Sequence, residues 1–345
     1  MKITIKDVAK EAKVSVTTVS RVINKNTKVS SATVKKVSAA MKKLGYCSAQ
    51  IGKSPRKSRS QTIMAIIPSI DNPLFGDVLR GMRAGAAEHE YEIIACVSSD
   101  SITNEQRLLS MLSNHAAEAA VILGTQLDKD KLNELSKDFY IALCCEYVEG
   151  ADVLAVTVDD SAGAYYATRN FINMGHTKIA IVSTKTCSSS SKEREKGYLK
   201  ALKESGIEFR EEYIFRGGYN YNNGADAFNT FMSLSDSPTA VFCVSDILAL
   251  GFANQAIKAD IKIGVDISIC GFDNIPFSGM HSPGITTIEQ PGFEIGRTAV
   301  EELIYRIHNG VKSSRHITLN FELISRDSIR SLNPSKPPTS KKRKA

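Results

Sequence analysis

The feature that most constrains the fold is a regular alternation of strand-like and helix-like segments, which begins at Thr62. Eight short runs rich in β-branched residues are typical of strands: TIMAIIPS, YEIIACVSS, AAVILGT, FYIALCCE, LAVTVDD, KIAIVST, TAVFCVSD and ISICGFD. Helical segments lie between most of them, at residues 73–89, 104–115, 161–174, 192–205, 246–260 and 293–309. Such alternation predicts parallel sheets covered by helices on both faces. There are too many strands for one sheet, so we expect two doubly wound parallel-sheet subdomains.

The first 60 residues differ from the rest in charge. They hold fifteen lysines and arginines against Asp7 and Glu11, a net charge of +13, and the residues after Arg330 add +5. Because the whole chain carries only +7, residues 61–330 carry −11. A basic head on an acidic body indicates that the head binds a polyanion and the body does not.

The head contains the pattern of a small all-α helix-turn-helix unit. Helical spacing and capping residues predict a first helix capped by Thr4, a break at Lys13-Val14, and a second helix, Val16 to Ile23, capped by Ser15. The apolar positions expected to face the core are Ile5, Val8, Ala9, Ala12, Val19, Val22 and Ile23. A third helix follows, with Val34, Val37, Met41 and Leu44 expected to be buried and Gly45 as its C-cap.

The second helix leaves small side chains and one arginine off its core face. These are Val16, Thr17, Thr18, Ser20 and Arg21. Side chains of this size at the start of a helix suit the major groove of DNA, where base edges are read.

The stretch IKDVAKEAKVSVTTVSRVIN, followed by LGY, closely resembles the DNA-binding head of the LacI/GalR family of transcriptional regulators. The resemblance continues through the body in DNPLF, VDD, GHTKIAIV, REKGYLKAL, SDILALG, DISICGFDN and PGITTIEQP. It implies a homodimer that reads a near-palindromic operator, with Val16 and Thr17 as the main specificity residues. Lys13 stands where the family usually has glycine, which puts the geometry of the turn in question.

The resemblance also implies a hinge that touches DNA, at residues 47–60. In the family this segment forms a short helix on the operator and inserts a leucine into the minor groove. Lys53 keeps the basic position, whereas Gly52 and Pro55 replace a small alanine and the leucine, which weakens the helix. The full set of expected DNA-binding residues is Thr4, Ser15, Val16, Thr17, Thr18, Ser20, Arg21, Asn24, Lys53 and Pro55.

For the body, the resemblance implies a periplasmic-binding-protein-like core with the effector between its two subdomains. The expected domains are a head at 1–46, the hinge at 47–60, a core at 61–331 and a disordered basic tail at 332–345. Within the core, the N-subdomain takes about 61–159 and 290–319, and the C-subdomain about 160–289 and 320–331.

Strand ends and motif positions together select six effector-binding residues: Phe75, Glu146, Arg194, Tyr219, Ser245 and Asp273. Carboxylates accept hydroxyl hydrogens, arginine donates paired hydrogen bonds, and aromatic rings cover the apolar face of a sugar. Other roles remain open for several of them. Asp273 and Asp246, which each end a strand-like run, can instead be helix caps. Tyr219 can be an aromatic residue of the surface, and Arg194 can lie on a solvated helix face. The polar run Thr184–Ser191 is expected to be a loop, either over the ligand or in solvent.

These residues favour a sugar-like or nucleoside-like effector, and the resemblance to the LacI/GalR family implies a repressor. We expect no enzyme, cofactor or metal site, because no nucleophile–base pair and no metal-binding motif is present. The scattered cysteines are expected to be free thiols, and His176 to have a core or capping role. The charged start of the chain gives no signal peptide, so we expect a cytoplasmic, nucleoid-associated protein rather than a transport binding protein. Control by a phosphocarrier protein instead of a small molecule remains an alternative.

Overall fold

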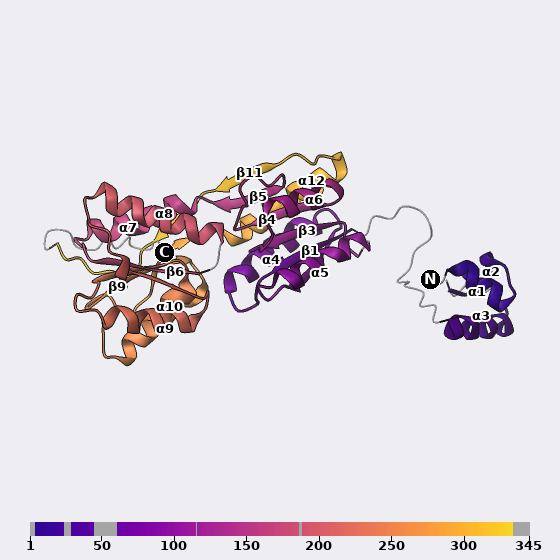
Figure 1. Ribbon diagram of the computed structural model, residues 1–345, viewed down its shortest axis with the longest axis horizontal. Helices are drawn as coiled ribbons and strands as arrows, with labels where there is room; N and C mark the ends of the chain where they lie inside the picture. The colour runs from indigo at the N-terminus through magenta and orange to yellow at the C-terminus, as the bar shows by residue number, and fades with distance from the viewer. Residues whose placement is uncertain (1–3, 24–28, 45–60, 115, 186–187, 334–345) are drawn as a thin grey trace. The chain divides into compact units, whose positions relative to one another are not determined.

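The computed structural model describes residues 4–23, 29–44, 61–114, 116–185 and 188–333 (Figure 1). The chain divides into two compact units, residues 1–59 and 60–345. Asn24, Lys53, Pro55, the C-cap Gly45 and the hinge at 47–60 lie outside the described residues, as does the tail from residue 334.

The head is a three-helix unit with the helices expected from the sequence. They are α1 (Ile5–Ala12), α2 (Val16–Ile23) and α3 (Ser31–Leu44). Val8, Val19 and Val37 are fully buried between them. Val34 was expected in this core, but it is 38% exposed. It shares a face with Val37 by spacing, yet it lies in the first turn of α3, where the described part of the head does not cover it.

The turn between α1 and α2 forms with a lysine in the left-handed conformation. Lys13 has φ 51° and ψ 46°, and its amide donates to the carbonyl oxygens of Ala9 and Lys10. For an L-residue other than glycine this conformation costs about 1–2 kcal/mol. Ser15 caps α2, because its Oγ accepts the Thr18 amide at 3.1 Å. At the start of α1, the Asp7 carboxylate accepts from both the amide and the hydroxyl of Thr4. The helix-turn-helix geometry is therefore retained without the glycine.

The second unit contains two six-stranded sheets. The first has the order β11-β5-β4-β3-β1-β2 and is parallel throughout. Its strands are β1 (Thr62–Ile67), β2 (Glu92–Val97), β3 (Ala119–Leu123), β4 (Tyr140–Cys144), β5 (Leu154–Val158) and β11 (Arg315–Leu319). The central strands β1 and β3 are apolar and almost completely buried, as expected for a parallel sheet covered on both faces.

The second sheet has the order β12-β10-β9-β8-β6-β7, with only the edge strand β12 antiparallel to its neighbour. Its strands are β6 (Ile179–Thr184), β7 (Ile214–Gly217), β8 (Ala240–Cys243), β9 (Ser268–Asp273), β10 (Thr286–Glu289) and β12 (Glu322–Ile324). The chain passes between the two sheets three times, after β5, after β10 and after β11.

Helices cover these sheets in packed pairs (Figure 1). The first subdomain carries α4 (Pro73–Ala87), α5 (Ile102–Ser113), α6 (Lys129–Asp138) and α12 (Gly292–Asn309). The second carries α7 (Asp160–Asn173), α8 (Ser189–Glu204), α9 (Tyr221–Met232), α10 (Asp246–Lys258) and the short α11 (Pro276–Met280). Helix α12 packs on α4 through Gly81 and Gly296, where a Cβ atom would lie 1.9 and 2.0 Å from backbone oxygens of the partner helix.

The structure confirms the eight strands expected in the body and corrects the boundaries of other segments. Ser189–Ser191, expected in a polar loop, form the first turn of α8, and Ser188 caps it by accepting the Ser191 amide. The tail was expected from residue 332, but the Leu332 amide still donates to Met174. The eight strand-like runs and the expected helices did not include α6, α9, α11, β7 or β10–β12. Most of these segments are short or carry few apolar residues, whereas α9 has 12 residues, buries Phe228 and Phe231, and was overlooked.

His176 is a fully buried hub of the second subdomain. Its Nδ1 lies 2.9 Å from Thr239 Oγ1, and its Nε2 lies 3.0 Å from Ser268 Oγ and 3.2 Å from the Arg330 carbonyl oxygen. Burial lowers the pKa of His176 to about 4. The ring is therefore neutral at pH 7, and it joins the C-terminal segment to the sheet, which confirms the expected core role.

This burial predicts an acid-sensitive contribution to stability. The unfolded state binds the proton near pH 6.5 and the folded state only near pH 4, so the free energy of unfolding falls as the pH drops through that window. The loss is about 3 kcal/mol at most. Denaturant unfolding between pH 7 and 4 should show this slope in the parent protein and in the exposed-histidine control His89→Gln. The His176→Gln variant should lack it. Equal slopes in all three proteins would contradict the assignment.

Candidate functional site

Polar side chains from both subdomains meet at the carboxyl ends of the parallel strands. Glu146 lies two residues beyond the end of β4, Asp160 begins α7 after β5, and Asp273 is the last residue of β9. Gln290 directly follows β10. In open α/β sheets this edge is where ligands bind, because the loops there leave space and expose backbone groups. The cluster brings together residues that are far apart in the sequence.

Arg194 lies at the centre of the cluster, and its side chain is only 2% exposed. Its Nε donates to Asp160 Oδ1 at 2.8 Å, and Nη1 donates to the Val244 carbonyl at 2.5 Å and to Tyr219 Oη at 3.2 Å. The guanidinium lies over the Phe272 ring, 3.7 Å from the centroid. The expectation of a possible solvated helix face is therefore wrong for Arg194. A charge buried this deeply requires paired partners, and Asp160 supplies the main one.

Three carboxyl groups surround this one cation. Burial raises the pKa of Glu146 to about 7, although the Ser190 hydroxyl opposes the shift. Burial also raises the pKa of Asp160 and of Asp273 to about 6, with Arg194 acting against it in both cases. The site thus contains three carboxyl groups, and the positive charge of Arg194 is already paired with Asp160. Such a site disfavours an anionic ligand.

Two buried acceptor atoms in the cluster are left without a hydrogen bond. Gln290 Nε2 donates to Asp273 Oδ1 at 2.7 Å, but Asp273 Oδ2 and Gln290 Oε1 have no partner among the described residues. The Asn72 side chain comes close enough to Asp273 to lower its pKa. A buried acceptor without a donor is costly, so these oxygens mark where a ligand with O–H or N–H donors would be bound.

Contacts at the loop after β4 join the two subdomains. Ser190 Oγ donates to Glu146 Oε1 at 3.1 Å, and the Tyr147 amide donates to Ser189 Oγ at 3.2 Å. The Tyr147 hydroxyl also donates to Glu193 Oε1 at 3.3 Å. Ser189, Ser190 and Glu193 all belong to α8 of the second subdomain, whereas Glu146 and Tyr147 follow β4 of the first. The subdomains are therefore held together beside the polar cluster.

Of the other expected effector residues, Tyr219 contacts Arg194 directly and Ser245 lies beside Tyr219, whereas no hydrogen bond, ion pair or ring contact of the Phe75 side chain joins it to the described residues of the cluster. Ser245 is fully buried and caps α10, where its Oγ accepts the Leu248 amide at 3.4 Å. Tyr219 is partly buried, and its hydroxyl donates to the Val244 carbonyl at 3.3 Å. Phe75 lies in the first turn of α4 and packs partly buried against the large core. Asp246 is not a cap but accepts from the Ile275 amide and from the hydroxyls of Ser278 and Thr287.

Sequence reasoning missed several residues of this cluster: Asn72, Tyr147, Asp160, Ser190 and Gln290. Asn72 and Asp160 lie in the DNPLF and VDD motifs, so the signal was present without a role attached. Gln290 likewise lies in the motif PGITTIEQP, and Ser190 in the polar run Thr184–Ser191, without a role assigned to either side chain. For Tyr147 no local signal exists, since its place depends on contacts between subdomains.

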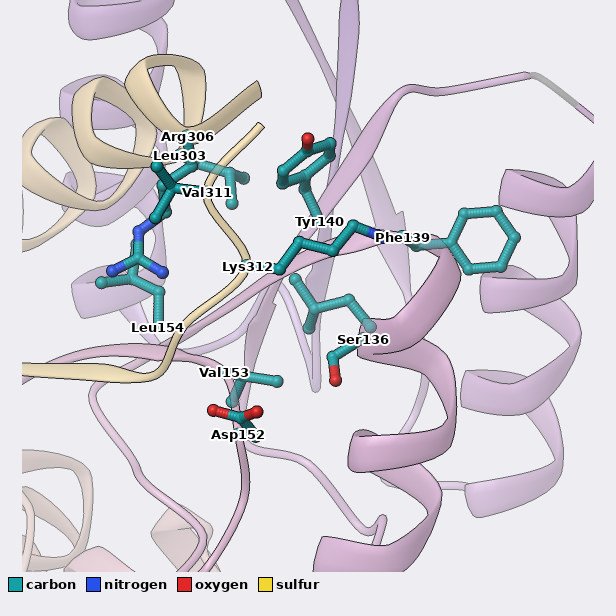
Figure 2. Close-up of a pocket in the computed structure, with 11 residues that line it drawn as sticks. Ser136, Phe139, Tyr140, Asp152, Val153, Leu154, Leu303, Arg306, Val311 and Lys312 are labelled. Atoms are coloured by element: carbon teal, nitrogen blue, oxygen red, sulfur yellow. The ribbon is translucent and has the colours of Figure 1, made fainter. Parts of the chain in front are cut away.

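Two hollows elsewhere in the first subdomain differ from this cluster. The one in Figure 2 has a volume of about 10 Å³, room for roughly one water molecule. Around it Lys312 donates to the Lys137 carbonyl and lies over the Tyr140 ring, which fastens the segment after α12 to the sheet. The second, of about 660 Å³, is an open depression beside Tyr147 and His316. Neither is lined by Arg194, Asp160 or Asp273, although Tyr147 of the loop after β4 lines the second.

The head presents its expected DNA-reading side chains on its surface. Thr4, Ser15, Val16, Thr17 and Arg21 are exposed, and Thr18 and Ser20 are partly exposed. Val16 is an apolar side chain left 41% exposed at the start of α2. This face can therefore enter a groove without rearrangement of the helices.

The fold and the site define a class of protein, a helix-turn-helix head joined to a periplasmic-binding-protein-like ligand-binding core. The model for bacterial regulatory proteins of the lacI family matches residues 4–48. The model for periplasmic binding proteins and the sugar-binding domain of the LacI family matches residues 60–327. The chain belongs to the LacI family of transcriptional regulators, which are DNA-binding proteins with a ligand-binding domain and not enzymes.

Named relatives and solved structures agree with this assignment. The chain is 33% identical to the HTH-type transcriptional repressor PurR of Photobacterium profundum, over 96% of this chain and 99% of that protein. It is 32% identical to the repressor CytR of Escherichia coli, over 95% and 97% of the two chains. A LacI family regulator from Enterococcus faecium with bound ribose superposes with a TM-score of 0.70 at 27% identity, covering 79% of this chain and 100% of that one.

The described part of the chain contains neither a membrane-spanning helix nor a cluster of metal ligands. None of its helices has the length and apolar character needed to cross a membrane. No group of three or more histidine, cysteine, aspartate or glutamate side chains is arranged to hold a metal ion in the same residues.

The electrostatics of Asp273 predict a trade-off between stability and binding. Because burial raises the pKa of Asp273 from 3.8 to about 6, its ionised form lowers the free energy of unfolding above pH 6. This loss of stability disappears as the pH falls from 6 to 3.8 and the folded state takes up the proton. Asp273→Asn should raise the free energy of unfolding at pH 8 by about 2 kcal/mol, with the gain vanishing near pH 4. Denaturant titrations at both pH values test this, with the exposed Asp138→Asn as control. A loss of stability at pH 8 would show that the carboxylate is favourably held.

Proposed function

We propose that this regulator is a repressor whose operator affinity is controlled by a neutral sugar-like or nucleoside-like effector bound around Arg194 and Asp273. The observation that carries the proposal is the pair of buried acceptors, Asp273 Oδ2 and Gln290 Oε1, for which the described residues supply no donor. Hydroxyl groups of a polyol supply such donors. The bound ribose of the Enterococcus relative supports the same class of ligand. The comparisons give no support to control by a phosphocarrier protein.

Access to the site requires that the subdomains move. Arg194, Asp160 and Asp273 are almost fully buried, and Ser190 and Tyr147 hold the subdomains together beside them. Effector binding is then linked to the angle between subdomains, and that angle is coupled to the heads. Operator and effector affinities must influence each other reciprocally.

The proposal includes a homodimer acting on chromosomal DNA in the cytoplasm. The edge strand β2 leaves Ile94 47% and Val97 41% exposed, and Ile102 at the start of α5 is 47% exposed. An exposed apolar edge strand is a hazard unless another chain covers it. A second copy there would bring two heads to two operator half-sites, with the residues expected from the sequence, including Asn24, Lys53 and Pro55, at the DNA.

The effector class can be tested by a thermal-shift screen of the full-length protein. D-ribose, hexoses and nucleosides at millimolar concentration are compared with ribose 5-phosphate. A neutral ligand at about a hundred times its Kd stabilises the folded state by about 2.7 kcal/mol, which raises the melting temperature by several degrees. The phosphorylated sugar should give no shift, because Arg194 is already paired. Asp273→Asn should lose the shift and Asp138→Asn should keep it. Preferential binding of the phosphorylated sugar would refute the proposed class.

The DNA-reading role can be tested by selection from random duplexes with the full-length protein. A dimer predicts an inverted repeat as the selected site. Thr17→Ala should change the preferred base at one position of each half-site, at a cost of about 1–3 kcal/mol in discrimination. The exposed Ser38→Ala on α3 should leave preference unchanged. A uniform loss of affinity for all sequences in Thr17→Ala would assign Thr17 a scaffold role.

A further inference from the structure

The turn that follows β9 holds two consecutive residues in the left-handed region. Asp273 has φ 114° and Asn274 has φ 56°, and neither is glycine. Each such residue costs about 1–3 kcal/mol and persists only where the surroundings determine the conformation. The turn carries the carboxyl group with the unpartnered Oδ2, so what holds the turn also sets where that oxygen lies.

Asn274 is fixed at both ends of its side chain. Its Nδ2 donates to Glu289 Oε1 at 3.1 Å, and its Oδ1 accepts from Arg326 Nη2 at 2.6 Å. The backbone on the other side is fixed as well, because the Ile275 amide donates to Asp246 Oδ2 at 2.9 Å. The amide orientation of Asn274 is thus set by a carboxylate on one side and a cation on the other.

Arg326 is itself held in one position. Nη1 donates to the Ile285 carbonyl at 2.6 Å, and the Arg326 amide donates to Thr286 Oγ1 at 3.0 Å. The stem of the side chain lies against Gly284 and the guanidinium against Gly279, where added Cβ atoms would lie 3.1 Å from Arg326 Cδ and 3.4 Å from Nη2. Arg326 follows β12, which the chain reaches by its third passage between the sheets.

We propose that Arg326 is a positioning residue of the effector site. It clamps the strained Asp273–Asn274 turn through its hydrogen bond to Asn274, so that the Asp273 carboxyl group is presented to the effector. This inference rests on the proposed effector site and adds a determinant of its geometry. A bidentate planar cation suits the task, because one nitrogen is bound to the loop and the other to Asn274.

The test compares Arg326→Met with Arg330→Met in the full-length protein without ligand. Arg330 lies four residues further on and donates to the Val265 carbonyl instead, so it is a matched control. Hydrogen–deuterium exchange should be about fivefold faster or more at the Ile275 and Ser278 amides in Arg326→Met, as expected for the loss of a hydrogen bond worth about 1 kcal/mol. Unchanged exchange, or the same increase in Arg330→Met, would overturn the proposal.

A second-site variant separates positioning from general destabilisation. Glycine adopts a left-handed φ without cost, so Asn274→Gly added to Arg326→Met should return exchange toward the parent rate. Asn274→Ala alone should behave like Arg326→Met. If Asn274→Gly gives no rescue, the strained turn is not what Arg326 supports, and the proposal fails.

Binding of D-ribose connects the clamp to the site. Where ribose binds the parent protein, Arg326→Met should raise its Kd about tenfold, Asn274→Gly should reverse much of that increase, and Arg330→Met should leave it unchanged. An unchanged Kd in Arg326→Met would overturn the positioning role. If ribose does not bind the parent protein, ribose is not the effector, while the exchange measurements still decide the role of Arg326.

Discussion

The buried ion pair between Arg194 and Asp160 is the interaction on which the candidate site depends. A guanidinium at 2% exposure is tolerable only with a carboxylate at 2.8 Å, neutral acceptors and an aromatic ring around it. Those partners come from α7, the strand end after β8, and Phe272 of β9. One charge thereby fixes the relative placement of three strand ends, and it leaves the remaining carboxyl groups, Asp273 and Glu146, without a full counter-charge.

This arrangement explains how the site proposed for a neutral ligand is built from charged residues. The raised pKa values of Asp273 and Glu146 show that burial disfavours the ionised form of both carboxyl groups. Two acceptor oxygens remain unpaired, and the turn beside them is strained. Strain and unpaired groups at one place are typical of functional sites, because they are relieved or used only when the ligand arrives.

Much of the fold follows from local sequence patterns. Strongly apolar runs such as TIMAIIPS can be buried only in a covered parallel sheet, and the short amphipathic segments of the head can form only small packed helices. Short or polar segments escaped this reasoning, as α6 shows with Leu132 as its one buried residue. The serines before Lys192 were misread as a loop, because their burial depends on Glu146 and not on their own composition.

The sequence by itself determined the class of protein, since the head, the strand–helix alternation, the strand-end residues Glu146 and Asp273 and the helix residue Arg194 are all local signals. Tertiary structure alone decided how these residues are paired. Asp160 and Arg194 are 34 positions apart, and Asn274 and Arg326 are 52 apart. Such pairs are set by chain topology, by the backbone angles of one turn and by contacts between subdomains. The periodicity of the sequence does not reveal these pairs, because each pair depends on where a distant strand ends.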